Sequence, residues 1–295
     1  MSDTKGASPR ILLQLDGDPQ PSVFDAVVAV DAGVEHLFRH GSVTPEAVRD
    51  LVYGAIFTRG GDALSSTAIF VGGSDVRHGE SLLQAAVDSF LGPLRVSVMF
   101  DANGANTTAA AAVLAAARHL ELAKCKAAVL GGTGPVGQRA ALLLASAGAD
   151  VVVGSRSVDR ALAVCENIRT SRPGAKLTPH ATSSIVERQE TLRDAQLVIA
   201  AGAAGARLLS ADELRAAETL EVAIDLNAVP PVGLEGIEST ARGDQVGSLI
   251  GYGAIGVGST KMKIHKAAIR QLYQAHDQVL DAQEIFAIGQ RLEAN

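Results

Sequence analysis

The sequence predicts an α/β protein with two lobes and a cleft between them, and three observations carry this prediction. Short apolar runs of strand length alternate with helix-like segments along the chain. The composition is 47% hydrophobic but only 3% aromatic, and its 30 glycines and valine-rich runs are typical of buried parallel strands. A chain of 295 residues is long enough for one large or two medium domains.

The N-terminal part alternates strand-like and helix-like segments. A first apolar run, 11–15, ends before a polar turn that is rich in Asp, Gly and Pro. Thr44, Pro45 and Glu46 have the features of a helix start, with an N-cap, a proline in the first turn and an acid near the helix dipole. Further expected elements are strands over 66–71 and 95–100 and helices over 79–90 and, rich in alanine, about 106–122. Polar residues gather after the strand ends, which is where open α/β sheets bind ligands.

The C-terminal half continues the alternation. The expected strands are 127–130, 150–153, 196–200 and 222–226. One helical stretch, about 261–274, and a short tail follow them.

A glycine-rich turn gives the strongest indication of function. Gly132, Gly134 and Gly137 fit G-x-G-x-x-G directly after the apolar run 127–130 and directly before a helical segment. In such a turn the first glycine allows the tight bend, the second the approach of a pyrophosphate, and the third close helix–strand packing. The negative pyrophosphate then lies against the helix N-terminus. The predicted cofactor-binding residues of this turn are Gly132, Thr133, Gly134, Pro135, Val136 and Gly137.

The end of the next strand favours NADP, with NAD also possible. An NAD site usually has Asp or Glu at this position, whereas here the strand runs into Ser155 and Arg156, with Arg160 one turn later. A guanidinium could hold the 2′-phosphate of NADP; the alternative is a solvated arginine at a helix start. Gly202 and Asn227 follow two later strands and are expected beside the nicotinamide.

A second match to the same pattern, Gly251, Gly253 and Gly256, lacks the required context. No strand is expected after it, so it cannot form a βαβ unit, and its following residues do not fit a P-loop. We expect a flexible loop or a close approach of two backbones there.

Composition and charge exclude several classes of protein. The net charge of −6 argues against nucleic acid or an anionic membrane as the main partner. Cys125 and Cys165 are too few for a disulfide framework or a zinc site, and His36 and His40 have no third ligand nearby, so we expect no metal. No stretch approaches the ~20 apolar residues of a membrane span. We expect a cytoplasmic protein.

Several segments together resemble one family. They are Phe-Val-Gly-Gly (70–73), Asp-Ala-Asn-Gly-Ala-Asn-Thr-Thr (101–108), Gly-Gly-Thr-Gly-Pro-Val-Gly (131–137), Asp-Leu-Asn-Ala-Val-Pro-Pro (225–231), Gly-Ala-Ile-Gly (253–256) and Lys-Met-Lys-Ile-His (261–265). The chain resembles the bacterial NAD(P)-dependent methylene-tetrahydromethanopterin dehydrogenases of one-carbon metabolism, from residues 16–25 to 281–285. The resemblance implies a Rossmann-type NADP-binding domain over 123–255 and an N-terminal α/β pterin-binding domain over 1–122 plus 256–295. It also implies a homo-oligomer.

The implied reaction is reversible hydride transfer from methylene-tetrahydromethanopterin to the nicotinamide. The resemblance places a lysine in the active site, and we favour Lys261 over Lys263 because it is expected at the junction of a glycine-rich loop and a helix. The expected pterin-binding residues follow two strands of the first lobe; they are Asp16, Asp18, Asp101, Asn103, Asn106 and Thr107. For Asp16 and Asp18 the alternative is a solvated turn, and for Asn106 and Thr107 a helix N-cap.

Two alternatives remain at this stage. One is a methylene-tetrahydrofolate dehydrogenase, although the Tyr-x-x-x-Lys dyad of the folate relatives has Phe57 where the lysine would follow Tyr53. The other is a non-catalytic NADP-binding redox sensor, which would not need polar residues at the strand ends of the first lobe. If the protein is the enzyme, no general base is expected, because a departing hydride requires no proton to be removed.

Overall fold

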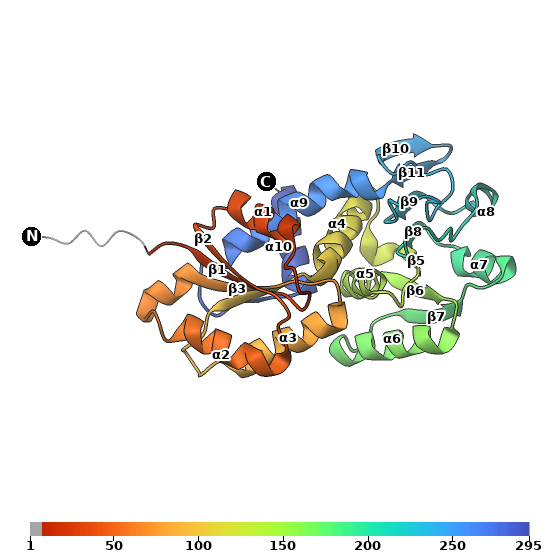
Figure 1. The fold of residues 1–295 in the computed structure, drawn as a ribbon. Helices are drawn as coiled ribbons and strands as arrows, with labels where there is room; N and C mark the ends of the chain where they lie inside the picture. The colour runs from red at the N-terminus through yellow and green to blue at the C-terminus, as the bar shows by residue number, and fades with distance from the viewer. Residues whose placement is uncertain (1–7, 295) are drawn as a thin grey trace, which may run out of the picture. The chain divides into compact units, whose positions relative to one another are not determined.

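The computed structural model describes residues 8–294, and these form two compact units, each built around its own sheet (Figure 1). The first unit contains the chain up to Thr107 together with the residues from Met262 onward, and the second contains Thr108–Lys261. Both sheets are made mainly of parallel strands joined by helices. The predicted α/β class is therefore confirmed.

The first unit has a five-stranded, fully parallel sheet in the order β12-β4-β3-β1-β2. Its strands are β1 (Ile11–Leu15), β2 (His36–His40), β3 (Thr67–Val71), β4 (Ser97–Phe100) and β12 (Val279–Leu280). Its helices are α1 (Val23–Asp31), α2 (Pro45–Ile56), α3 (Val76–Asp88) and α10 (Ala282–Ala294), with short 3-10 turns at Gly61–Ser66 and Ala102–Gly104. Helices α2 and α3 cover one face of the sheet, and α1 lies on the opposite face (Figure 1).

The strand order of this sheet reverses next to β1. The chain passes from β1 to β2 on one side, and then to β3, β4 and β12 on the other. The carboxyl ends of β1 and β3 therefore form the switch point at which open α/β sheets bind ligands. The loops that begin at Asp16 and Gly72 meet there.

The second unit has a seven-stranded sheet in the order β10-β11-β9-β8-β5-β6-β7, parallel except for β10. Its strands are β5 (Lys126–Leu130), β6 (Asp150–Ser155), β7 (Leu177–Ala181), β8 (Leu197–Ala200), β9 (Val222–Asp225), β10 (Arg242–Val246) and β11 (Leu249–Tyr252). Its helices are α5 (Pro135–Ser146), α6 (Val158–Ser171), α7 (Ile185–Leu192) and α8 (Ala211–Ala216), with a 3-10 turn at Leu122–Lys124. The six parallel strands have the dinucleotide-binding order, with its switch point between β5 and β8.

Two long helices run from one unit into the other. They are α4 (Ala105–Ala117) and α9 (Ala254–Gln271). The alanines of α4 are almost all fully buried, because small side chains let neighbouring elements approach the helix on every side.

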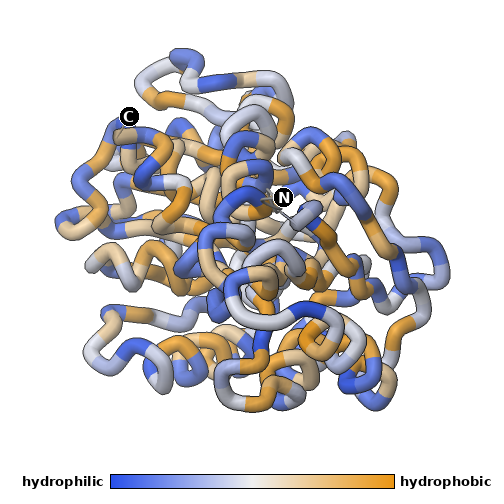
Figure 2. The backbone as a smooth tube through the Cα atoms, turned by 90° about the vertical axis from the view of Figure 1, so that its left-hand side faces the viewer, coloured by the Kyte–Doolittle hydropathy of each residue, from blue (hydrophilic) through white to orange (hydrophobic). Residues whose placement is uncertain are grey.

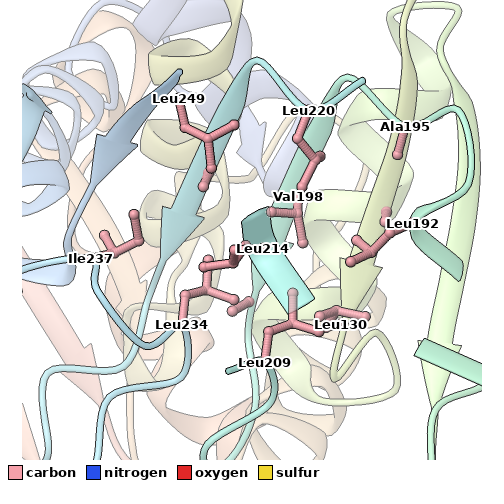
Figure 3. Packing of buried hydrophobic residues seen from close by; sticks show 13 residues of the cluster. Leu130, Leu192, Ala195, Val198, Leu209, Leu214, Leu220, Leu234, Ile237 and Leu249 are labelled. Atoms are coloured by element: carbon pink, nitrogen blue, oxygen red, sulfur yellow. The ribbon is translucent and has the colours of Figure 1, made fainter. Parts of the chain in front are cut away.

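The cores contain mostly aliphatic side chains, as the composition predicts. In the second unit Leu209, Leu214 and Leu234 pack against Leu130 and Val198 of the sheet (Figure 3). Hydrophobic and hydrophilic residues alternate along the helices, which is the pattern of helices that cover a sheet on one side (Figure 2). Among the described residues, no helix is long and apolar enough to cross a membrane.

The structure corrects the expectations for the C-terminal region. Helix α9 already begins at Ala254, so Gly253 and Gly256 lie at its start rather than in a flexible loop. A Cβ atom at Gly256 would lie 1.7 Å from the carbonyl oxygen of Ala241, so the alternative expectation, a close approach of two backbones, is confirmed. Only a short tail was expected after this helix, but the structure has strand β12 and helix α10 there. Strand β2 was also not expected, because most of its side chains are exposed and form no apolar run.

Candidate functional site

The glycine-rich turn after β5 is packed tightly between neighbouring backbones. The amide of Gly132 donates to the carbonyl of Gly154 in β6 at 2.9 Å. Gly131 has a φ of +69°, and a Cβ there would come within 2.8 Å of the Ala201 backbone. A Cβ at Gly137 would lie 2.5 Å from the Gly131 carbonyl oxygen. A side chain at Gly137 would push helix α5 away from the turn, and one at Gly131 would clash with the backbone after β8, so both positions require glycine.

Helix α5 presents an open N-terminus at the same edge. Gly134 is its N-cap and has no side chain to cap it, and Pro135 occupies the first helical position, where its missing N–H costs nothing. The amides of Val136 and Gly137 belong to the first turn. Such an uncapped start, with the positive end of the helix dipole, is suited to a phosphate group.

The end of β6 lies beside this turn. Ser155 is buried, with its hydroxyl 3.4 Å from that of Thr133, and it accepts a hydrogen bond from the amide of Ser157. Arg156 and Arg160 are both exposed, and their guanidinium groups make no hydrogen bond or ion pair within residues 8–294. No carboxylate follows this strand directly. The edge can therefore accept a phosphate on the ribose without repulsion.

Gly202 and Asn227 follow the neighbouring strands β8 and β9, as expected. Gly202 is partly exposed. The side chain of Asn227, in contrast, is engaged in its own turn: it donates to the carbonyl of Pro231 and accepts from the amide of Val229. Burial raises the pKa of Asp225, although amides that include that of Asn227 donate to its carboxylate and oppose the shift. The side chain of Asn227 therefore stabilises the turn after β9, a role that was not expected in addition to its predicted place beside the nicotinamide.

In the first unit, Asp16 and Asp18 shape the loop after β1. Asp16 is fully buried and accepts from the amides of Asp18 and Ser22. Asp18 is half-buried and accepts from both the amide and the hydroxyl of Ser74, which follows β3. Both carboxylates bind backbone amides of the switch-point loops. The solvated turn that was the alternative is wrong for Asp16.

The loop after β4 is built in a similar way. Asp101 accepts from the amide and the hydroxyl of Thr107, at 3.0 and 2.6 Å. Asn106 donates to Asp281, and all three of Asp101, Asn106 and Thr107 are buried. Asn103 is exposed and has a φ of 52°, and its backbone amide donates to the carbonyl of Gly73, two residues after β3. Of these four residues, only Asn103 faces solvent.

Helix α9 carries Lys261 and a histidine that the sequence analysis did not single out. Lys261 is partly exposed and lies two turns inside α9, so the prediction that it lies at a loop–helix junction is wrong. His265, one turn later, is fully buried with its Nδ1 4.0 Å from Oδ2 of Asp101, and it stacks on Phe70. A histidine on the apolar stripe of a helix was the signal in the sequence.

Tyr53, Phe57 and Arg59 lie at the end of α2 and in the loop that follows it. The rings of Tyr53 and Phe57 pack edge to face at 5.3 Å. Arg59 donates to the carbonyl oxygens of Pro9 and Ser66, which precede β1 and β3. These residues are therefore at the amino edge of the sheet, opposite the loops described above.

The comparisons with known proteins agree with this geometry. A family model described as "Methylene-tetrahydromethanopterin dehydrogenase, N-terminal" matches residues 23–103. The chain is 42% identical to the "Bifunctional protein MdtA" of Methylorubrum extorquens, over 97% of this chain and 99% of that protein. It is 30% identical to the "NAD(P)-dependent methylenetetrahydromethanopterin dehydrogenase" of the same organism, over 91% of this chain and 93% of that protein.

Among solved structures, the quinate dehydrogenase from Corynebacterium glutamicum in complex with NAD matches with a TM-score of 0.49 and 15% identity, over 98% of this chain and 100% of that chain. This likeness is too distant to bear on function. The two relatives from Methylorubrum are aligned over nearly their whole length. The chain therefore belongs to the methylene-tetrahydromethanopterin dehydrogenase family.

Proposed function

We propose that this protein catalyses the reversible oxidation of methylene-tetrahydromethanopterin to methenyl-tetrahydromethanopterin, with NADP as hydride acceptor, in the one-carbon metabolism of formaldehyde. The observation that carries the proposal is an open dinucleotide turn in a chain whose relative is named an NAD(P)-dependent methylenetetrahydromethanopterin dehydrogenase. NAD is a possible second acceptor, because Arg156 favours NADP without excluding NAD.

The residues of the second unit fit NADP. The pyrophosphate would bind at Gly132–Gly137, where the first turn of α5 is uncapped. Ser155, Arg156 and Arg160 would hold the 2′-phosphate. Gly202, at the end of β8, would leave room for the nicotinamide. Asn227 would act there through its backbone, since its side chain holds the following turn.

When bound, NADP supplies the acceptor for the hydride. The substrate cation that remains is stabilised by its own two nitrogens, so the chain needs no group that removes a proton. The residues of the chain bind the nicotinamide ring and the reacting ring of the pterin substrate and orient them toward each other. Good alignment of reactants can contribute about 7–11 kcal/mol to lowering the barrier.

The pterin site is proposed within a pterin-binding domain of residues 1–122 plus 256–295. Burial divides the candidates into two groups. Asp16, Asp101, Asn106 and Thr107 are buried and would hold the loops in shape. Asp18, Asn103 and Lys261 are at least partly exposed and would contact the pterin. Lys261 is the proposed catalytic residue because the resemblance to the family places a lysine in the active site.

A hydride-transfer assay tests the proposal. Purified protein is offered methylene-tetrahydromethanopterin or methylene-tetrahydrofolate, each with NADP or NAD, and formation of reduced nicotinamide is followed at its absorbance band. Turnover with the methanopterin substrate and NADP supports the proposal. Preference for the folate substrate would favour the alternative dehydrogenase, and NADP binding without turnover of either would favour a redox sensor. A homo-oligomer and a cytoplasmic location stay predictions from the sequence.

A further inference from the structure

His265 lies where four elements of the first unit meet. Its ring stacks on Phe70 of β3, with centroids 5.6 Å apart and planes inclined by 23°. The ring of Phe24, near the start of α1, lies 6.4 Å away. The carboxylate of Asp101, directly after β4, has its Oδ2 4.0 Å from Nδ1 of His265. The histidine itself is on α9.

Asp101 is fixed in place independently of the histidine. Thr107 donates its amide and its hydroxyl to the two carboxylate oxygens, and the Asp101 amide donates to the carbonyl of Val71. A buried carboxylate held by several donors has one well-defined position. The position of the Asp101 carboxylate therefore does not depend on His265, and the imidazole of His265 packs against a fixed group at the carboxyl edge of the sheet.

Lys261 shares a helix face with His265. Residues four apart in an α-helix lie one above the other, about 6 Å apart along the axis. Both belong to the same unbroken helix, α9. A contact that fixes the rotation and the height of α9 at residue 265 therefore fixes them at residue 261 as well.

We propose that His265 is a positioning residue, which through its buried contact with Asp101 holds α9 in the register that places Lys261 for pterin binding. This inference rests on the proposed function, in which Lys261 contacts the pterin. The competing explanation is that His265 only fills space in the core. The two differ in what a phenylalanine would do, because Phe keeps an aromatic ring of similar size and loses both ring nitrogens.

Kinetics of H265F in two backgrounds test the proposal. In the otherwise unchanged protein, H265F should raise the KM for methylene-tetrahydromethanopterin about tenfold, since small misplacements of binding groups are costly. The KM for NADP should stay within about twofold. In the K261A background, H265F should change the pterin KM by no more than about twofold, because the group that it positions is gone. The same increase in both backgrounds, or no increase in either, would overturn the proposal.

Hydrogen exchange of α9 tests the positioning role of His265 separately from the proposed function, because it needs no substrate turnover. H265F should speed amide exchange across residues 258–264, whether or not either pterin is turned over; unchanged exchange overturns the positioning role. Absence of turnover in the unchanged protein would refute the function instead. I269V is the matched control, because Ile269 is also buried on α9 and a lost methyl group there should leave both readouts unchanged. If H265F does not fold, H265L, which also lacks both ring nitrogens, serves in the same experiments.

Discussion

Replacing Arg156 by alanine should weaken binding of NADP and leave NAD unaffected. A hydrogen bond to a charged group contributes about 1.5–3 kcal/mol. Arg156 is exposed, so solvent screening favours the lower end of that range. About 1.5 kcal/mol corresponds to about a tenfold increase in the KM for NADP. The guanidinium binds no other described residue, so the substitution should not lower the stability of the fold.

Steady-state kinetics with both cofactors measure this effect. The informative quantity is the ratio of kcat/KM for NADP to that for NAD, which should fall about tenfold in R156A. R160A is the matched control: it removes an equally exposed arginine one turn further on, and its effect on the ratio should be smaller. An unchanged ratio in R156A, or an equal loss with NAD, would refute the assignment of Arg156 to the 2′-phosphate.

Three further substitutions or modifications test other parts of the structure. G137A should raise the KM for NADP at least tenfold, since its Cβ would lie 2.5 Å from the Gly131 carbonyl oxygen and the turn would have to move. G54A, in α2, should not, because a Cβ there would meet no atom within 4 Å apart from its own helix backbone. A normal KM in G137A would show that the turn yields without loss. Burial acts to raise the pKa of Glu213, but hydrogen bonds from Arg188 and Ser210 outweigh it and the pKa is lowered. Its folded pKa is below the unfolded value of about 4.5, so its stabilising effect is present above that pH and is lost as the pH falls through the folded pKa. Urea unfolding should therefore show E213Q less stable than the unchanged protein at pH 7, with a difference that shrinks below about pH 4.5; a constant difference would contradict the pairing. Burial raises the pKa of the Cys125 thiol to about 11, so a thiol reagent at pH 8 should label it slowly in the native protein and quickly in denaturant. Rapid labelling of the native protein would show that this thiol is not buried.

Local patterns were sufficient to predict most of the strands and the glycine-rich turn between β5 and α5. The run 11–15 was predicted at its observed bounds because it is apolar and ends in turn residues. The glycine-rich turn was identifiable from its glycine spacing, and at Gly137 the close approach of the neighbouring backbone explains why glycine is needed. A position that needs glycine for close packing can be recognised from residue type and spacing alone.

Elements without such a pattern were missed. β2 pairs with β1 through its backbone and exposes most of its side chains, so nothing in its composition distinguishes it from a loop. The start of α9 was missed because Gly253, Gly256 and Gly258 suggest a loop. In the structure, the backbone of residues 238–241 approaches the first two of these glycines closely enough to exclude any side chain. Long-range packing, rather than helix propensity, decides that segment.

The polar residues after the strands show why a site is harder to predict than a fold. Sequence position placed Asp16 and Asp18 at the carboxyl end of β1, and the same motif gave no reason to treat them differently. The structure separates them: Asp16 is buried on backbone amides, while Asp18 is half-buried and reaches Ser74 across the switch point. A carboxylate that has several amide donors loses them if it turns to a ligand, which costs about 1–3 kcal/mol for each buried group left unsatisfied. We therefore propose that side chains that retain exposure, such as Asn103 and Lys261, contact the pterin, and that the buried acids hold the loops after β1 and β4 in shape.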